Sequence, residues 1–177
     1  MRLRRRRRGS RPPAKNIATA TRLVLDADAL NAIAGDTHLQ AQLRTRATRN
    51  WHTVLTPHPR EAARLLKLTS SEVQHDRLAA AQRLAQGFRC TVVLKGSGTV
   101  VAAPELVPCI NPTGNARLAT AGTGDVLAGA IGAGLAAGVP EFQAACEAVY
   151  LHGLAADRWP AGQTLTASML AGSLRPA

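Results

Sequence analysis

Residues 111–125 read NPTGNARLATAGTGD and lead from a short apolar segment into a long apolar run. Gly122 and Gly124 allow backbone conformations that are closed to other residues, and they let the chain approach a ligand closely. The free amides at the start of the following helix favour negative charge. Asp125 then stands where phosphate chemistry needs a base. An acid near a helix start is also favoured by capping and by the helix dipole, so the motif alone leaves both interpretations open.

Composition points to a single α/β domain. The chain has 177 residues, of which 46% are hydrophobic and 3% aromatic. This length suits about one domain, and a core of Ala, Val and Leu suits helices packed on a sheet better than a surface that stacks bases. The formal net charge of +11 is concentrated at one end, because residues 1–22 hold nine Lys or Arg and no acid. The rest of the chain is nearly neutral.

The N-terminal segment contains the block Arg4 to Arg8 and no hydrophobic period. Its self-repulsion opposes compact structure, so we expect a basic disordered tail over residues 1–20 and a folded domain over residues 21–177. Such a tail binds nucleic acid through phosphates without sequence choice, and a specific nucleic-acid function is disfavoured.

Three features bear on the cellular compartment. Gly9, Ser10 and prolines follow the arginines where a signal peptide has an apolar region, and the uncharged, Gly- and Ala-rich run at 126–139 is too short to span a membrane. The cysteines are spread along the sequence without a Cys-x-x-Cys pair, which predicts buried thiols at Cys90, Cys109 and Cys146. We expect a cytoplasmic protein that makes no contact with a membrane.

Short apolar runs alternate with helical patterns along the body of the chain. Strands are predicted at residues 21–26, 52–55, 90–95, 99–102 and 106–110. Helices are predicted at residues 27–34 and 60–66, from Ser70 or Ser71 to about Gly87, and at 125–138, 141–158 and 166–174. This alternation predicts a layered α/β sheet.

Polar side chains stand at or just after four predicted strand ends. They are Asp26, His58, Lys95 and Asn111. Ligands of open α/β sheets bind at the carboxyl ends of strands, so we expect these four side chains to share one edge of the sheet.

The turn from Lys95 to Thr99 reads KGSGT and joins two apolar runs. A tight turn with a lysine and a threonine offers amides, a hydroxyl and a cation to a phosphate, although an ordinary hairpin explains the pattern as well. The sequence has no Gly-x-x-x-x-Gly-Lys, so this is not a P-loop. Gly132-x-Gly134-x-x-Ala137 lies inside a predicted helix with no strand before it, and we attribute it to close helix packing.

Four motifs, in this order, resemble those of the ADP/ATP-dependent NAD(P)H-hydrate dehydratase family, a branch of the ribokinase-like fold. They are VLDADALN at 24–31, LTPHPRE at 55–61, LKGSGT at 94–99 and the stretch from Asn111 to Gly129. The resemblance implies a ribokinase-like layered sheet with helices on both faces.

The resemblance also implies a role for individual residues. His58 is similar to the residue that contacts the hydrated nicotinamide nucleotide, and Asp125 to the base beside its hydroxyl. The AMP part of the adenine nucleotide is implied at Lys95, Gly96, Ser97, Gly98 and Thr99, a further nucleotide contact at Gly124, and an anion hole at Gly122, Thr123 and Gly124. Supporting roles are implied at Asp26, Asn31 and Asn115, although Asp26 can equally be a helix cap.

The implied reaction is a kinase-like step followed by elimination. Asp125 takes the proton of the C6 hydroxyl of hydrated NADH or NADPH, and the oxygen attacks the terminal phosphoryl group of ADP or ATP, with ADP favoured. Phosphate then leaves far more easily than water would, and the reduced nucleotide is regenerated. Mg²⁺ and the amides at Gly122 and Gly124 are expected to offset the charge on the transferring group.

The sequence departs from the family pattern in three places. The family's domain is longer and starts with several βα units before the segment at Asp26, so we expect these N-terminal units to be missing and the flank of that strand to be exposed. Arg60 replaces a glycine, and residues 116–118 replace Pro-Gly-Met. An inactive truncated remnant, or a chain that binds nucleic acid non-specifically through its tail, is therefore the alternative to an active dehydratase. A homo-oligomer stays open.

Overall fold

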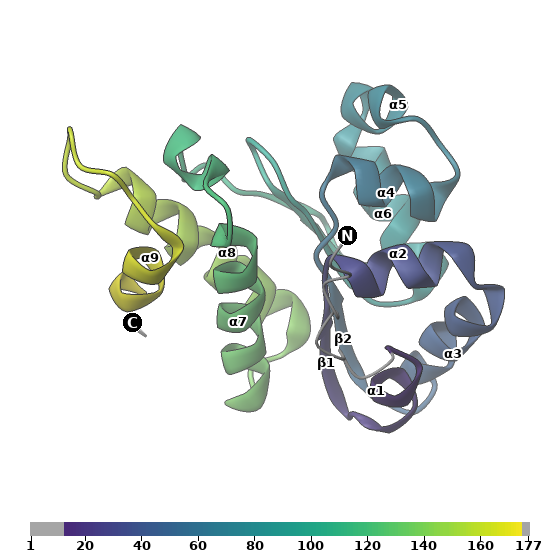
Figure 1. The fold of residues 1–177 in the computed structure, drawn as a ribbon. Coiled ribbons are helices and arrows are strands. Elements are labelled where there is room, and N and C mark those ends of the chain that lie inside the picture. Colours follow the sequence, from purple (N-terminus) through teal and green to yellow (C-terminus); the bar gives the residue numbers. More distant parts are fainter. Residues whose placement is uncertain (1–12, 175–177) are drawn as a thin grey trace, which may run out of the picture.

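Residues 13–174, which the computed structural model describes, form a five-stranded sheet with helices on both faces (Figure 1). The strands are β1 (Arg22–Leu25), β2 (His52–Leu55), β3 (Thr91–Leu94), β4 (Val100–Ala102) and β5 (Cys109–Ile110). They lie in the order β1-β2-β3-β4-β5; the first three are parallel, and β4 is antiparallel to both of its neighbours. The carboxyl ends of β1, β2, β3 and β5 therefore meet at one edge.

The two halves of the chain cover opposite faces of this sheet, on either side of the strands in Figure 1. The first half supplies α1 (Pro13–Thr19), α2 (Asp28–Gly35), α3 (Thr37–Ala47), α4 (Pro59–Leu66), α5 (Ser70–His75) and α6 (Arg77–Phe88). The second half supplies the short 3₁₀ helix η1 (Ala116–Ala119), α7 (Thr123–Ala136), α8 (Glu141–Asp157) and α9 (Ala167–Ser173). The fold class predicted from the sequence is confirmed.

Alternating side chains of the central strands enter two separate cores. In β3, Val92 and Leu94 pack among the helices of the first half, whereas Val93 packs against α7 and α8. In β2, Leu55 packs among the helices of the first half and Val54 packs against α7 and α8. All of these side chains are fully buried, which is why the strands read as unbroken apolar runs rather than as an alternating pattern.

The predicted disordered tail is wrong for its last part. Pro13–Thr19 forms α1, whose Ile17 is buried in the core, while residues 1–12 lie outside the described part of the chain. The buried Arg46 holds this helix in place, because its Nη1 donates to the carbonyl oxygens of Ile17 at 2.8 Å and Ala20 at 2.7 Å. The partner that orders the segment is thus almost thirty residues away, and local composition gives no sign of it.

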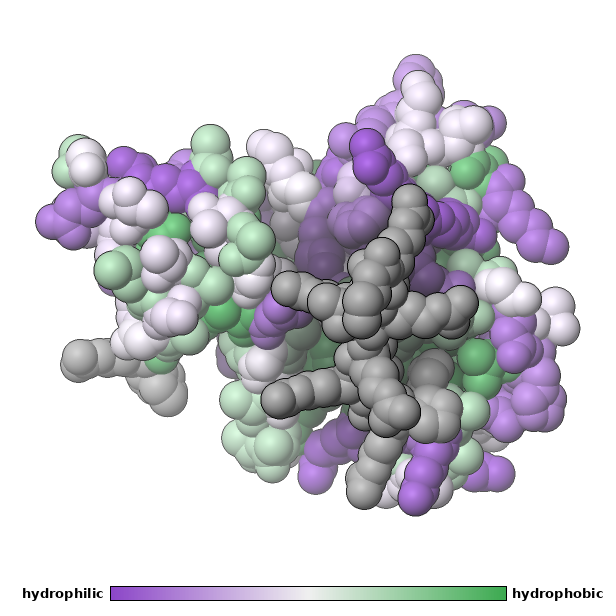
Figure 2. All heavy atoms as spheres, viewed as in Figure 1, coloured by the Kyte–Doolittle hydropathy of each residue, from purple (hydrophilic) through white to green (hydrophobic). Residues whose placement is uncertain are grey.

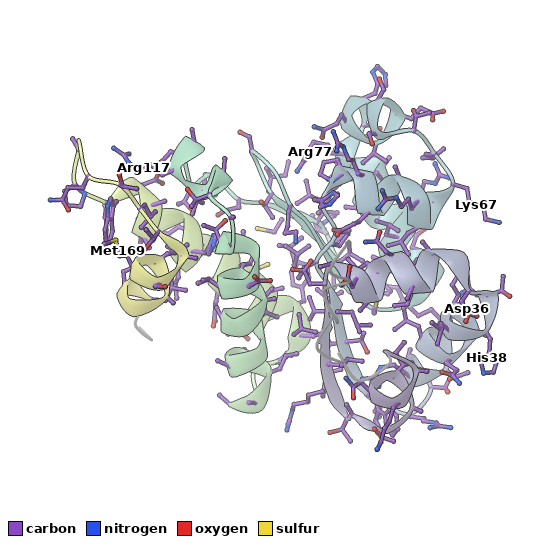
Figure 3. All side chains as sticks on the ribbon, in the orientation of Figure 1. Asp36, His38, Lys67, Arg77, Arg117 and Met169 are labelled. Carbon is purple, nitrogen blue, oxygen red and sulfur yellow. The ribbon has the colours of Figure 1, made fainter. Side chains whose placement is uncertain are left out.

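Helix α3 was not predicted, because its sequence is largely polar. Leu39 and Leu43 are its buried apolar residues, together with the apolar stem of Arg46. The Oδ1 atom of Asp36 caps the helix by accepting from the amides of His38 and Leu39. Asp36 and His38 lie at the outer end of α3, away from the strands (Figure 3).

Two other details differ from the prediction. The single helix expected after Ser70 is broken at Asp76, whose carboxylate caps α6 by accepting from the amide of Ala79. The strand expected at 106–110 is shortened to Cys109–Ile110, which follows a proline that has no N–H for the sheet.

The cysteine prediction is correct in part. Cys90 is buried, as expected, but Cys109 is exposed on β5 and Cys146 is half-buried on α8. On the face shown in Figure 2, hydrophilic residues gather mainly over the helices of the first half. Within residues 13–174, no helix is both long and apolar enough to cross a lipid bilayer.

Candidate functional site

The polar side chains predicted at the strand ends do meet at one edge of the sheet. The Nζ atom of Lys95, after β3, lies 2.6 Å from Oδ1 of Asp26, after β1. The amide of Lys95 donates to the carbonyl oxygen of Pro57 at 2.9 Å, which brings the segment after β2 alongside. Asn111, after β5, lines the same hollow as Lys95. The carboxyl edge therefore carries an ion pair, with the segments that follow β2 and β5 close to it.

A hollow of about 460 Å³ opens beside this edge. Its wall consists of the bend at 95–99, parts of the loop at 111–119, the first turn of α7 and the residues of α8 around His152. Two of these four segments, the 95–99 bend and the first turn of α7, are the ones that sequence analysis assigned to nucleotide binding. Their convergence from distant parts of the chain makes this hollow the candidate site.

The 95–99 bend is held by Arg77, at the start of α6. Its Nη2 atom donates to the carbonyl oxygens of Leu94 at 3.0 Å and Gly98 at 3.4 Å, which are the two ends of the bend. A Cβ atom on Gly96 would lie 2.8 Å from Nη1 of Arg77, so a glycine lets the guanidinium pack directly against the backbone. Partial burial lowers the pKa of Arg77 without removing its charge. Figure 3 shows Arg77 beside the connection between β3 and β4.

The loop at 111–115 is fixed to α8 by side-chain hydrogen bonds. Thr113 Oγ1 donates to the carbonyl oxygen of Tyr150 at 3.0 Å, and Asn111 Nδ2 donates to that of Val149 at 3.4 Å. Further along α8, the carboxylate of Asp157 accepts from the amide of Gly114 at 2.7 Å. It also accepts from the side chain of Asn115 at 2.9 Å.

The close contact between this loop and α8 depends on Gly153. A Cβ atom at this position would lie 2.2 Å from Oγ1 of Thr113 and 2.7 Å from the Thr113 carbonyl group. Because backbone as well as side chain is in the way, no rotamer change would relieve the contact. The loop that forms one wall of the hollow thus sits on α8 at the closest distance that a glycine permits.

The first turn of α7 borders the hollow through Thr123 and Gly124. Gly122 precedes the helix with φ 88°, a conformation that favours glycine, and turns the chain into the axis of α7. The hydroxyl of the buried Thr123 donates to the carbonyl oxygens of Leu118 and Thr120, so this side chain stabilises the turn and is not free for a ligand. The amide of Thr123 is also used, since it donates to the carbonyl oxygen of Thr120 at 3.3 Å, whereas Gly124 lines the hollow.

Lys95 and Gly124 lie together. A Cβ atom on Gly124 would be 3.4 Å from Nζ of Lys95 and 3.9 Å from Oδ2 of Asp26. A cation and a helix N-terminus thus face the same point, which favours an anion there, while Asp26 balances the lysine when no anion is bound. Ala27, the next residue, has φ 50°, and its amide donates to the carboxylate of Asp26 at 2.9 Å.

Asp125 lies beside the hollow but does not line it. Its side chain is exposed on the first turn of α7, and within residues 13–174 its carboxylate has no hydrogen bond or ion pair. Two helical turns later, Gly132 lies on the same helix face and approaches the side chain of Val24 in β1. Asp125 thus faces the β1 side of the edge; within residues 13–174, β1 pairs with β2 on one side only and its other side is open.

His58 occupies a capping position. Its Nδ1 atom accepts from the amides of Arg60 at 3.1 Å and Glu61 at 3.3 Å, and Glu61 returns a bond to the amide of His58. The predicted His58 contact with a nucleotide therefore has to use the other ring nitrogen, which lies 3.4 Å from a carboxylate oxygen of Glu61. The side chain does not line the hollow, although its neighbour Pro57 is bonded to Lys95.

A resident metal site is not formed by protein groups alone. Within the described part of the chain, no three His, Cys, Asp or Glu side chains gather closely enough to hold a metal ion. Two carboxylates, Asp26 and Asp125, flank Gly124. This donor set fits Mg²⁺ in the form in which phosphate oxygens supply most of its ligands.

Sequence analysis did not identify four residues that hold the segments around the hollow in place. They are Arg77, His152, Gly153 and Asp157. Each stands in a helix where its pattern fits an ordinary helical residue, and its partner is a backbone group far away in the sequence. His152 is buried, and this burial lowers the pKa of its imidazole.

A family model described as NAD(P)H-hydrate dehydratase matches residues 13–176. The chain is 50% identical over 155 residues to the ADP-dependent (S)-NAD(P)H-hydrate dehydratase of Neisseria meningitidis. The match covers 88% of this chain and 51% of the relative, so the chain spans about half of that protein's length.

Solved structures agree with the family model. The ADP/ATP-dependent NAD(P)H-hydrate dehydratase of Bacillus subtilis, crystallised with ATP and Mg²⁺, has a TM-score of 0.63 and 37% identity, over 69% of this chain and 45% of that one. A ribokinase-like superfamily protein of Enterococcus faecalis has a TM-score of 0.63 and 25% identity, over 90% of this chain and 63% of that one.

Proposed function

The chain belongs to the NAD(P)H-hydrate dehydratase family, and on that premise we propose that it carries the nucleotide-binding and phosphoryl-transfer part of an ADP-dependent dehydratase. Its substrate would be the S form of hydrated NADH or NADPH, and its reaction would repair that damaged nucleotide. The observation that carries the proposal is the meeting of the 95–99 bend, the 111–119 loop and the first turn of α7 around one hollow.

ADP is proposed to lie with its AMP part along the 95–99 bend. The hydroxyl of Thr99 and the backbone of Gly96 and Gly98 offer groups that bind ribose and phosphate oxygens. The terminal phosphate would then reach the point where Nζ of Lys95 faces Gly124. The positive charge and the amides at this point bind the phosphate and stabilise the charge that develops on it during transfer.

Asp125 is proposed to take the proton from the C6 hydroxyl of the hydrated ring. The hydroxyl oxygen then attacks the terminal phosphorus of ADP, so that a C–O–P bond forms and AMP leaves. Elimination breaks the C6–O bond with the electron pair of the ring nitrogen, and releases phosphate and the reduced nucleotide. The exposed position of Asp125 at the β1 side supports this role, because the hydrated nucleotide can approach its carboxylate from there.

Lys95 would switch partners during this reaction. Its ion pair with Asp26 keeps the ammonium beside Gly124 before the nucleotide binds, so the charge is already in place. Mg²⁺ bound to the phosphates would supply further positive charge, with Asp26 and Asp125 as its nearest protein carboxylates. His58 is proposed to contact the hydrated nucleotide through Nε2, while Nδ1 caps α4.

The proposal is tested with the purified full chain, hydrated NADH, Mg²⁺ and either ADP or ATP. Recovery of the absorbance of reduced nicotinamide reports the reaction, and we expect a higher rate with ADP. Asp125→Asn should lower kcat by roughly 10²–10⁴-fold, the usual effect of removing a general base. Asp28→Asn is the matched control, because Asp28 is an exposed acid in the first turn of α2.

Two outcomes would contradict the proposal. Equal rates for wild type and Asp125→Asn would remove this carboxylate from its role as base. Absence of ADP binding by calorimetry would remove the hollow from its role in nucleotide binding. The cytoplasmic location, the oligomeric state and any binding of nucleic acid by the tail stay predictions.

A further inference from the structure

His152 projects from the middle of α8 toward the first turn of α7. Its Nε2 atom lies 2.9 Å from the carbonyl oxygen of Thr123, and the side chain is buried at the back of the hollow. A carbonyl oxygen only accepts, so Nε2 must carry the hydrogen. Burial lowers the pKa of His152 and so favours the neutral ring, and the carbonyl acceptor selects the Nε2–H tautomer of that ring.

The bonded carbonyl belongs to the same peptide unit as the amide of Gly124. This unit is trans and planar, so its C=O and N–H bonds point in opposite directions. A group that holds the Thr123 oxygen therefore also sets the direction of the Gly124 N–H. Gly124 lines the hollow, and a Cβ atom on it would lie 3.4 Å from Nζ of Lys95, near which the transferring phosphate is proposed to lie.

No other hydrogen bond within the described residues joins a side chain of a distant element to this peptide unit. The hydroxyl of Thr123 bonds to the carbonyl oxygens of Leu118 and Thr120, which belong to the same segment and can move with it. His152 is 29 residues away on α8, the helix that also holds the 111–115 loop through Tyr150 and Asp157. The bond thus ties the first turn of α7 to α8, the same helix that fixes the 111–115 loop.

We propose that His152 is a positioning residue for phosphoryl transfer: its Nε2–H holds the Thr123–Gly124 peptide so that the Gly124 amide points at the transferring group. This proposal rests on the proposed function, in which Gly124 contacts that group. Ground-state binding of ADP depends mainly on the 95–99 bend, whereas the Gly124 amide matters most for the charge that develops during transfer. The residue should therefore affect kcat far more than the KM for ADP.

The variants separate the hydrogen bond from packing. His152→Phe keeps a ring of similar size but has no donor, and His152→Leu is a smaller apolar replacement in case phenylalanine does not fit. His152→Gln carries an N–H at nearly the same reach as Nε2. Phe and Leu should lower kcat by roughly 10–100-fold, with the KM for ADP within about 3-fold of wild type. Gln should stay within about 5-fold of the wild-type kcat.

A second readout does not depend on activity. In ¹⁵N-labelled protein without ligand, the amide resonance of Gly124 should shift in the Phe and Leu variants but keep its wild-type position in the Gln variant. A wild-type kcat in a folded Phe or Leu variant would overturn the proposal. So would a Gly124 resonance that is unchanged by Phe and Leu, or displaced equally by all three substitutions. If wild type itself shows no dehydratase activity, the proposed function fails while the resonance data still decide whether His152 positions the amide.

Discussion

The two sides of the carboxyl edge are built in different ways. On the side of the hollow, the 95–99 bend, the 111–115 loop and the first turn of α7 are each tied to a helix by a buried or half-buried side chain: Arg77, Thr113 and His152 respectively. On the β1 side, Asp125 is exposed without a described partner, and β1 has one open edge. Contacts within this chain thus fix the segments proposed to bind the nucleotide. Few contacts fix the carboxylate of Asp125, the proposed base.

This difference predicts that substitutions on the two sides will have different effects. Substitutions behind the hollow should disturb a preorganised wall and change ADP binding or phosphoryl transfer. Substitutions on the β1 side should leave the wall intact and affect only the base or its immediate surroundings. The match spans about half of the length of the Neisseria relative.

Gly153→Ala should give the largest effect, because the added Cβ would lie 2.2 Å from Oγ1 of Thr113 and 2.7 Å from its backbone. Either the 111–115 loop or α8 has to move, and we expect a loss of about 2–3 kcal/mol in the free energy of unfolding, together with loss of ADP binding. Urea denaturation and calorimetry measure the two effects.

Gly87→Ala is the matched control for this substitution. Gly87 is exposed in α6, and an added Cβ would meet nothing within 4 Å. Its replacement should raise the free energy of unfolding by about 0.5–1 kcal/mol through helix propensity. Similar effects of the two substitutions would show that the contact between the loop and α8 is not tight.

Arg77→Ala tests the support of the 95–99 bend. Without the bonds from Nη2 to the carbonyl oxygens of Leu94 and Gly98, the two ends of the bend are free to separate. We expect ADP to bind roughly 10-fold more weakly, which corresponds to about 1.4 kcal/mol. Arg83→Ala, an exposed position on the same helix, should bind ADP as wild type does. Equal calorimetric affinities for both variants would contradict the role of Arg77.

Asp26→Asn tests the boundary between the two sides. The Asp26–Lys95 pair is largely buried, with 14% and 20% of the respective side chains exposed, so its loss should lower the free energy of unfolding by about 1 kcal/mol. Asp28→Asn, two residues later and exposed, should change it by only a few tenths of that amount. A double-mutant cycle with Lys95→Met isolates the pair. A coupling energy near zero would mean that Lys95 is placed beside Gly124 by other contacts.

The sequence predicted those elements whose buried residues form a recognisable apolar run. The runs at 52–55 and 90–95 became the central strands, since side chains buried on both faces of a sheet leave an unbroken apolar signal. α1 was missed because it is held by Arg46, a charged residue far along the chain that donates to its carbonyl groups, and α3 was missed because its sequence is largely polar.

Sequence analysis identified the residues proposed to face the ligand, but not the residues that hold those segments in place. Glycines and a lysine at strand ends, as in the 95–99 bend, carry a recognisable signal because their chemistry is directed at a ligand. Arg77 and His152 bind backbone oxygens instead. A backbone oxygen is present at every residue, so no sequence pattern marks which one a side chain will reach.

The smallest expected effect is a pH dependence of the free energy of unfolding. It tests whether folding disfavours the protonation of His152. In the unfolded chain this histidine takes up a proton near its ordinary pKa of 6.5, whereas in the folded protein burial lowers the pKa. Between the two values the unfolded state binds more protons, so the free energy of unfolding should fall as the pH drops below 6.5 and stay level above it.

His152→Gln has no such group, so the difference in the free energy of unfolding between wild type and this variant should change over that interval alone. Urea titrations at closely spaced pH values measure this difference, and groups that titrate independently of His152 cancel in it. A difference that is constant with pH would mean that the ring is as readily protonated in the folded protein as in the unfolded chain. The first turn of α7 would then have to accommodate a cation at its back, and the wall of the hollow would be less rigidly built than the contrast with the β1 side requires.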